Sequence, residues 1–216
     1  GGFYNSQAAM SRAIDRSMYA DRNADMVSQF LRAAALFEDP WLRDFALKSL
    51  EAVVLRGYVP GGGVAHAAGI RGLLGDQIRV ASALVWAHLV TGQLPYSMLA
   101  LELVQFAVRT MWDERAGCFL DRAAGDTGSP LGLLREPARP FALNCEAACV
   151  LNRLASMTGD PAHRERAVAI LSALARESRQ HGLFGAPYAL AVREVIDRQS
   201  PLGLDLSPVD WHLDKD

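Results

Sequence analysis

Apolar residues recur along this chain at helical spacing, in segments that are separated by turns rich in glycine, proline or aspartate. Positions three or four residues apart fall on one face of an α-helix, so the spacing predicts helices rather than strands. The predicted helices cover residues 25–37, 40–55, 74–90, 95–111, 140–157, 163–176 and 187–197. Asn23 or Asp25 is expected to cap the first helix, because side-chain oxygens at this position accept hydrogen bonds from free backbone N–H groups.

A helix–turn–helix segment recurs three times around a polar turn residue. The copies begin at Phe30, Leu84 and Leu151, and their turns align on Asp39, Gln93 and Asp160. In every copy an alanine follows the turn residue by seven positions, and Leu or Val follows it by eight and by eleven. A helical hairpin that cannot bury its own apolar face stacks on its neighbours. The pattern therefore predicts an all-α chain of repeated antiparallel hairpins.

Two longer loops, residues 60–71 and 113–139, connect the predicted hairpins. In an arc of hairpins the short turns gather at one end and the long loops at the other, so both long loops should share one rim. Residues 60–63 (PGGG) are expected to lack regular structure, and residues 117–120 to form a small β-hairpin. Residues 1–197 should form the helical domain, and residues 198–216 an irregular tail.

Composition argues against several classes of partner. Half of the residues are hydrophobic, 21% are charged and the formal net charge is −2. The basic residues are scattered among acids, so we expect neither a nucleic-acid nor a membrane partner. The absence of an apolar run of roughly 18–20 residues and of a signal segment makes a cytoplasmic location the default expectation. Cys145 and Cys149 fit buried apolar positions, and neither a metal nor a cofactor is expected.

Five segments within residues 1–195 together resemble a known family. They are GGFYNSQ, DRSMYADRNADM, GLLGDQ, TMWDERAGCFLD and LREPARPFALNCEAACVLNRLASMTGD. They are similar to the C-terminal helical region of thioredoxin-domain-containing proteins of the spermatogenesis-associated type. That region is similar in fold to the six-hairpin glycosidases and N-acylglucosamine 2-epimerases, so the resemblance implies an (α/α)6 toroid. Arg22 stands where the family usually has an aromatic residue, and no thioredoxin domain is present to supply redox chemistry.

The predicted helices are fewer than a ring of six hairpins needs. The resemblance therefore implies a partial toroid. Such an arc is either a fragment of a longer protein, with an N-terminal domain missing, or is completed by another copy of the chain as a homo-oligomer.

Acidic, amide and aromatic side chains gather at the starts of the inner helices and in the long loops. The toroid resemblance implies that these positions surround a central cleft. The candidate catalytic residues are Asp21, Asp76 and Glu146; the candidate substrate-binding residues are Tyr19, Asn23, His66, Gln77, Trp112 and Asn144. Paired carboxylates suit general acid–base work on a glycosidic centre, and amides suit sugar hydroxyl groups. We expect two of the three carboxylates to approach within about 10 Å.

Structural roles compete with each of these interpretations. Asp76, Asn144 and Glu146 stand near helix starts, where capping is the commoner role. An epimerase would need a histidine base, for which His66 or His88 is available, although His88 also fits a packing position between helices. His163 is expected on an exposed turn.

Two functions therefore stay open. The first is a carbohydrate-binding or carbohydrate-modifying domain of the glycosidase or epimerase kind, with a small sugar-like ligand. The alternative is a non-catalytic helical scaffold that binds a protein partner or completes a toroid by oligomerisation. The sequence does not decide whether the chain is an enzyme.

Overall fold

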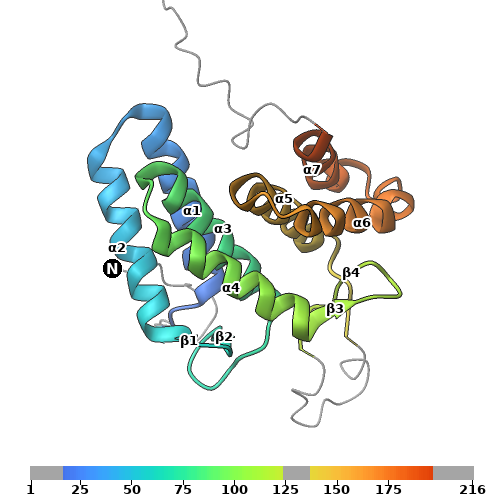
Figure 1. Cartoon of the computed structure of the whole chain (residues 1–216), viewed down its shortest axis with the longest axis horizontal. Coiled ribbons are helices and arrows are strands. Elements are labelled where there is room, and N and C mark those ends of the chain that lie inside the picture. The colour runs from blue at the N-terminus through green and yellow to red at the C-terminus, as the bar shows by residue number, and fades with distance from the viewer. Residues whose placement is uncertain (1–16, 124–136, 197–216) are drawn as a thin grey trace, which may run out of the picture.

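A computed structural model describes residues 17–123 and 137–196, and over these residues the predicted all-α class is confirmed (Figure 1). The α-helices are α1 (Ala20–Phe37), α2 (Pro40–Gly57), α3 (Leu74–Thr91), α4 (Leu94–Met111), α5 (Phe141–Thr158), α6 (Pro161–Ser178) and α7 (Ala186–Ile196). A short 3₁₀ helix, η2 (Gly182–Gly185), precedes α7. The predicted tail, 198–216, lies outside the described residues.

The helices pair as antiparallel hairpins: α1 with α2, α3 with α4, and α5 with α6. The first helices of the pairs contact one another in sequence, α1 with α3 and α3 with α5, and α7 packs on α5. Helices α1, α3 and α5 are the inner helices, and α7 continues their row. Helices α2, α4 and α6 each pack mainly on the inner helix of their own hairpin. In Figure 1 the arc runs from α2 at one side to α6 and α7 at the other.

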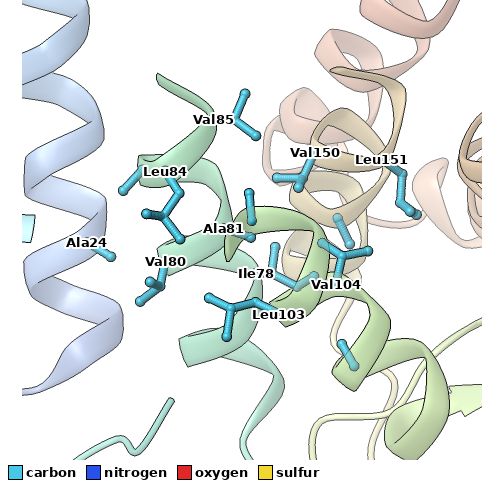
Figure 2. Close-up of a cluster of buried hydrophobic side chains, with 14 of the residues drawn as sticks. Ala24, Ile78, Val80, Ala81, Leu84, Val85, Leu103, Val104, Val150 and Leu151 are labelled. Atoms are coloured by element: carbon cyan, nitrogen blue, oxygen red, sulfur yellow. The ribbon is translucent and has the colours of Figure 1, made fainter. Parts of the chain in front are cut away.

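Helix α3 lies at the centre of the arc because it is apolar on nearly every face. Ile78, Val80, Ala81 and Val85 are completely buried. Figure 2 shows side chains of α3 packed between α1, α4 and α5. A helix that is apolar all round is stable only when neighbours enclose it, so α3 fixes the positions of the flanking hairpins.

The repeat predicted from the sequence reappears in the turns. Asp39 and Asp160 cap α2 and α6 through their side chains, and Gln93 occupies the same N-cap position of α4. The preceding helices end in a left-handed residue, which is Gly92 after α3 and Gly159 after α5. These local signals, together with a proline in the first turn of each second helix, set the short turns at one end of every hairpin.

Several expected details differ in the structure. Helix α1 begins at Ala20, so Asn23 and Asp25 lie inside the helix and Tyr19 is its N-cap. In the segment expected to be irregular, residues 60–62 form the turn of a hairpin and Gly63 begins its second strand, because β1 (Tyr58–Val59) pairs antiparallel with β2 (Gly63–Val64). The small hairpin predicted near residues 117–120 is confirmed as β3 (Trp112–Asp113) paired with β4 (Cys118–Phe119).

Histidine 163 is also placed differently from the expectation. Its side chain is buried in the first turn of α6 rather than exposed on a turn. Burial disfavours the charged imidazolium, and this lowers the pKa of His163. His88 lies in the last turn of α3, where its Nδ1 contacts the backbone oxygen of Gln93 across the short turn.

Candidate functional site

The fourth residue of each inner helix is an amide: Asn23 in α1, Gln77 in α3 and Asn144 in α5. All three are fully buried. Each side-chain NH₂ donates a hydrogen bond to the carbonyl four residues earlier, at Tyr19, Leu73 and Pro140 respectively. The amide position is therefore part of the repeat.

Two of these amides also hold the loop that precedes their helix. Gln77 Oε1 accepts a hydrogen bond from the Val64 N–H, and its Nε2 donates to the Val64 carbonyl, both at 2.8 Å. Asn144 makes the same pair of bonds with Phe119, at 2.8 and 3.0 Å. Both side chains are fully buried and clamp the β-hairpins. The substrate-binding role of Gln77 and Asn144 stays a prediction, which this clamping does not favour.

The two long loops meet at one rim, as their predicted placement requires. We call residues 58–73 the first loop, and residues 112–123 with 137–140 the second loop. Leu74 N–H donates to the Asp121 carbonyl, and Ala123 N–H donates to the Gly72 carbonyl. An isolated β-bridge joins Leu73 to Arg122. The loops therefore form a continuous layer over the N-terminal ends of the inner helices.

His66, in the first loop, contacts carboxylates of two inner helices. Its Nδ1 lies 2.9 Å from Asp76 Oδ1 and 3.6 Å from Asp21 Oδ1. The Asp21 N–H also donates to Asp76 Oδ1 at 3.1 Å. The prediction that two candidate carboxylates approach within about 10 Å is confirmed, because Asp21 and Asp76 offer oxygens within 4.8 Å of each other.

Asp76 is the most deeply buried member of this cluster, with no exposed surface. Burial raises its pKa to about 6, although the hydrogen bond from His66 opposes this change by favouring the charged form. A carboxylate without exposed surface does not contact a sugar ring directly. Asp76 therefore lies behind His66, and its catalytic role stays a prediction.

Arg79 joins the candidate carboxylates of α1 and α5. Its Nη1 donates to Asp21 Oδ2 at 3.0 Å, and its Nε donates to Glu146 Oε2 at 3.2 Å. Burial works against the guanidinium charge, but the hydrogen bond and charges of Glu146 and Asp21 outweigh it and raise the pKa of Arg79. The central inner helix thus carries a permanent cation between two acids.

The inner row encloses a pocket of about 390 Å³, which we call the concave pocket. Residues of α1, α3, α5 and α7 line it: Asp25, Ser28, Gln29, Arg32, Arg79, Ser82, Trp86, Cys145, Glu146, Cys149, Arg153, Pro187, Leu190, Arg193 and Glu194. Of the nine site residues predicted from the sequence, Glu146 alone lines this pocket. Its side chain is 42% exposed, so it can meet a ligand.

One wall of the concave pocket is an aromatic ring between arginines. The guanidinium carbons of Arg32 and Arg153 each lie 5.4 Å from the Trp86 ring centroid, a cation–π arrangement. Arg153 is also bound to Glu194 of α7 at 2.7 Å. These contacts fix the orientation of polar groups in the pocket.

The cysteines of the pocket have no nucleophilic character. Burial raises the pKa of Cys145 to about 11 and that of Cys149 to about 12. Both are free thiols, and both stay protonated near neutral pH. Their polar chemistry therefore contributes little to the site.

The other predicted residues lie at the rim. The Tyr19 ring packs against the His66 ring, with centroids 4.9 Å apart. Trp112 packs edge-on against Phe119 at 5.0 Å and against the hydrophobic core, which accounts for its position. Neither of these two residues lines the concave pocket.

Arg79 was missed as a site residue, although the repeat carries a signal for it. Asp25, Arg79 and Glu146 are each the sixth residue of an inner helix, and all three line the concave pocket. A charged side chain that returns at the same repeat position, among apolar neighbours, indicates a shared polar interior. Comparing the copies at this position would have found it.

Solved structures share the architecture. The family 76 glycoside hydrolase α-mannanase of Bacteroides thetaiotaomicron superposes with a TM-score of 0.71 at 11% identity, over 88% of this chain and 55% of that one. An inactive variant of the family 76 α-1,6-mannanase of Salegentibacter, in complex with α-1,6-mannotriose, gives 0.62 at 15% identity over 72% and 47%. The cellobiose 2-epimerase of Spirochaeta thermophila gives 0.63 at 20% identity over 81% and 47%.

These similarities define the class of fold: the chain is an arc of a six-hairpin, glycosidase-like (α/α) toroid. It spans about half the length of the structures that it matches. No protein-family model and no curated protein sequence matches the chain. Within the described residues, every helix is too short or too polar to cross a membrane.

Proposed function

We propose that the chain is a carbohydrate-binding or carbohydrate-modifying domain whose ligand occupies the concave pocket. The observation that carries this proposal is the position of Glu146 and Arg79. Both line the concave pocket, Arg79 from α3 and Glu146 from α5. The Arg79 Nε donates a hydrogen bond to Glu146 Oε2 at 3.2 Å. A carboxylate beside a guanidinium can bind adjacent sugar hydroxyl groups as acceptor and donor.

Glu146 is the candidate general base of the pocket. It is the predicted catalytic carboxylate that a ligand can touch, and in hydrolysis a positioned carboxylate takes a proton from the attacking water. Asp21 is a positioning residue in this scheme, because it holds the Nη1 side of Arg79 while Glu146 holds the Nε side. The structural neighbours include proteins named as a mannanase and as a cellobiose 2-epimerase, which supports a sugar as ligand.

The sequence resemblance to thioredoxin-domain proteins of the spermatogenesis-associated type adds a second part to the proposal. By that resemblance, the chain would be the helical region of such a protein and would be cytoplasmic. Both statements stay predictions.

Calorimetric titration with α-1,6-mannotriose and with cellobiose tests the proposal. We expect one sugar site per chain, with affinity reduced at least tenfold in Glu146→Gln. Glu165→Gln is the matched control, because Glu165 is an exposed glutamate on the outer helix α6. The proposal fails if neither sugar binds the wild-type chain, or if the two variants behave alike.

A helical scaffold is the second candidate, favoured by the apolar side chains at the α7 end of the arc. Leu183, Phe184, Leu190 and Ile196 are all well exposed there. Exposed apolar clusters are typical of protein contact surfaces. Light scattering separates the candidates: a stable dimer that Phe184→Ser dissociates supports the scaffold, whereas a monomer that binds sugar supports the first proposal.

A further inference from the structure

The rim holds a second group of chemically reactive side chains, separate from the lining of the concave pocket. Asp21, His66 and Asp76 each offer one ligand atom, and these atoms lie within 4.8 Å of one another. They come from α1, the first loop and α3. We propose that Asp21, His66 and Asp76 form a binding site for one divalent transition-metal ion.

The spacing of the donor atoms fits a shared ion. Two ligands that bind one ion at about 2.1 Å lie roughly 3.0–3.5 Å apart, depending on the coordination geometry. His66 Nδ1 lies 2.9 Å from Asp76 Oδ1 and 3.6 Å from Asp21 Oδ1. Small shifts would therefore bring all three donors to an ion.

Two buried carboxylate oxygens supply an independent observation. Asp76 Oδ2 and Asp21 Oδ1 are buried and accept no hydrogen bond from any described residue. The Asp76 side chain is fully buried, and its Oδ2 lacks the partners that Oδ1 has in His66 and the Asp21 N–H. A cation at the cluster would pair with Asp21 Oδ1 and compensate the charge of the buried Asp76 carboxylate.

The surroundings hold the three side chains in position. The His66 N–H donates to the Ile70 carbonyl, and the His66 carbonyl accepts from the Ala20 N–H at the start of α1. Arg79 donates to the outer oxygen of Asp21, Oδ2, and leaves Oδ1 directed to the cluster. Hydrogen bonds of this kind orient ligands in known metal sites.

The donor set indicates the kind of ion. One imidazole nitrogen with two carboxylate oxygens suits Zn²⁺ or Mn²⁺ better than a soft ion, which prefers sulfur ligands. Without an ion, His66 Nδ1 lies 2.9 Å from Asp76 Oδ1. His66 would bind the ion through Nδ1 as the neutral imidazole, whose one proton then lies on Nε2.

Calorimetric titration of the chelator-treated chain with ZnCl₂ and MnCl₂ tests the proposal. We expect one ion per chain, and affinity reduced at least tenfold in both His66→Gln and Asp76→Asn. His181→Gln is the matched control, because His181 pairs with Glu177 at the surface at 3.1 Å and should keep the wild-type affinity.

The proposal is overturned if the wild-type chain binds neither ion below millimolar concentration, or if His66→Gln binds as tightly as wild type. Equal loss in His181→Gln would also contradict it, since binding would then be a surface property. His66 is partly exposed, so His66→Gln decides the matter even if Asp76→Asn does not fold. Failure of sugar binding leaves this result unaffected.

Discussion

The first and second loops are each held by a buried amide of the helix that follows, which we call the clamp. The helix residue next to the clamp differs between the two cases. An amide at the fourth position of the following helix binds each β-hairpin, Gln77 in the first case and Asn144 in the second. The residue just before the clamp is Asp76 in α3 and Leu143 in α5. The fourth position therefore serves the architecture, while the third is free to vary in chemistry.

Neighbouring positions of the repeat therefore have a structural role and a chemical role. An amide whose oxygen and NH₂ are both bound to buried backbone groups cannot also bind a ligand. The carboxylate at the neighbouring position makes no such backbone bonds to a hairpin and joins a polar cluster with His66. Residues at repeat-equivalent positions should respond alike to substitution only where they clamp.

The largest expected effect is the loss of a clamp. Gln77→Ala leaves the buried N–H and C=O of Val64 unpaired, and Asn144→Ala does the same at Phe119. Each should lower the free energy of unfolding by about 3–4 kcal/mol, since an unsatisfied buried polar group costs about 1–3 kcal/mol. Urea unfolding followed by circular dichroism measures this, with the exposed Gln105→Ala as control. A loss below about 1 kcal/mol in either variant would break the equivalence.

The next expected effect is a pH dependence of the free energy of unfolding, which Asp76 should cause and Leu143 cannot. The pKa of Asp76 is about 6 in the folded chain, above its ordinary value of 3.8. A raised pKa contributes stability below pH 3.8, and this contribution is lost as the pH rises through 6. Wild type should therefore lose about 2 kcal/mol relative to Asp76→Asn between pH 4 and pH 7.

The measurement is urea unfolding of both chains across this range, with a chelator present so that no ion binds. Asp21, His66 and Arg79 face Asp76 or its partner in both chains. A difference that is flat between pH 4 and pH 7 would show that burial does not govern this carboxyl group.

A smaller effect sharpens the clamp itself. Gly63 has a φ of +69°, and an added Cβ would lie 2.5 Å from Gln77 Oε1. Gly63→Ala should cost about 2 kcal/mol from backbone strain and displacement of the amide. In a double-mutant cycle, only the part due to the amide should vanish in the Gln77→Ala background, because the backbone strain and the 2.7 Å approach to the Phe106 ring remain. Full additivity would mean that the glycine acts independently of the clamp.

The fold was largely accessible from sequence because its signals are local. Apolar periodicity predicted the helices, and Asp39 and Asp160 marked the turns that they cap. The repeat then required the hairpins to stack. The sequence predicted that the two loops share a rim but not their paths. The path of the first loop depends on hydrogen bonds such as that from the Val64 N–H to Gln77, and such bonds produce no periodic pattern in the sequence.

The candidate site was predicted unevenly for the same reason. Asp21 and Asp76 were chosen for their places at helix starts, and the structure brings them together through His66. Gln77 and Asn144 were chosen on the same ground, but their partners are backbone groups that no side-chain pattern reveals. Arg79 had a signal in the repeat, because Asp25 and Glu146 occupy the same helix position, but its bonds to Asp21 and Glu146 depend on the packing of α1 and α5.

The central claim is that a sugar ligand meets this chain in the concave pocket rather than at the clamped loops. A crystal structure of the chain soaked with α-1,6-mannotriose tests it most directly. We predict sugar density within hydrogen-bond distance of Glu146 and Arg79. Sugar bound instead against the first or second loop, with the concave pocket holding solvent alone, would contradict the account.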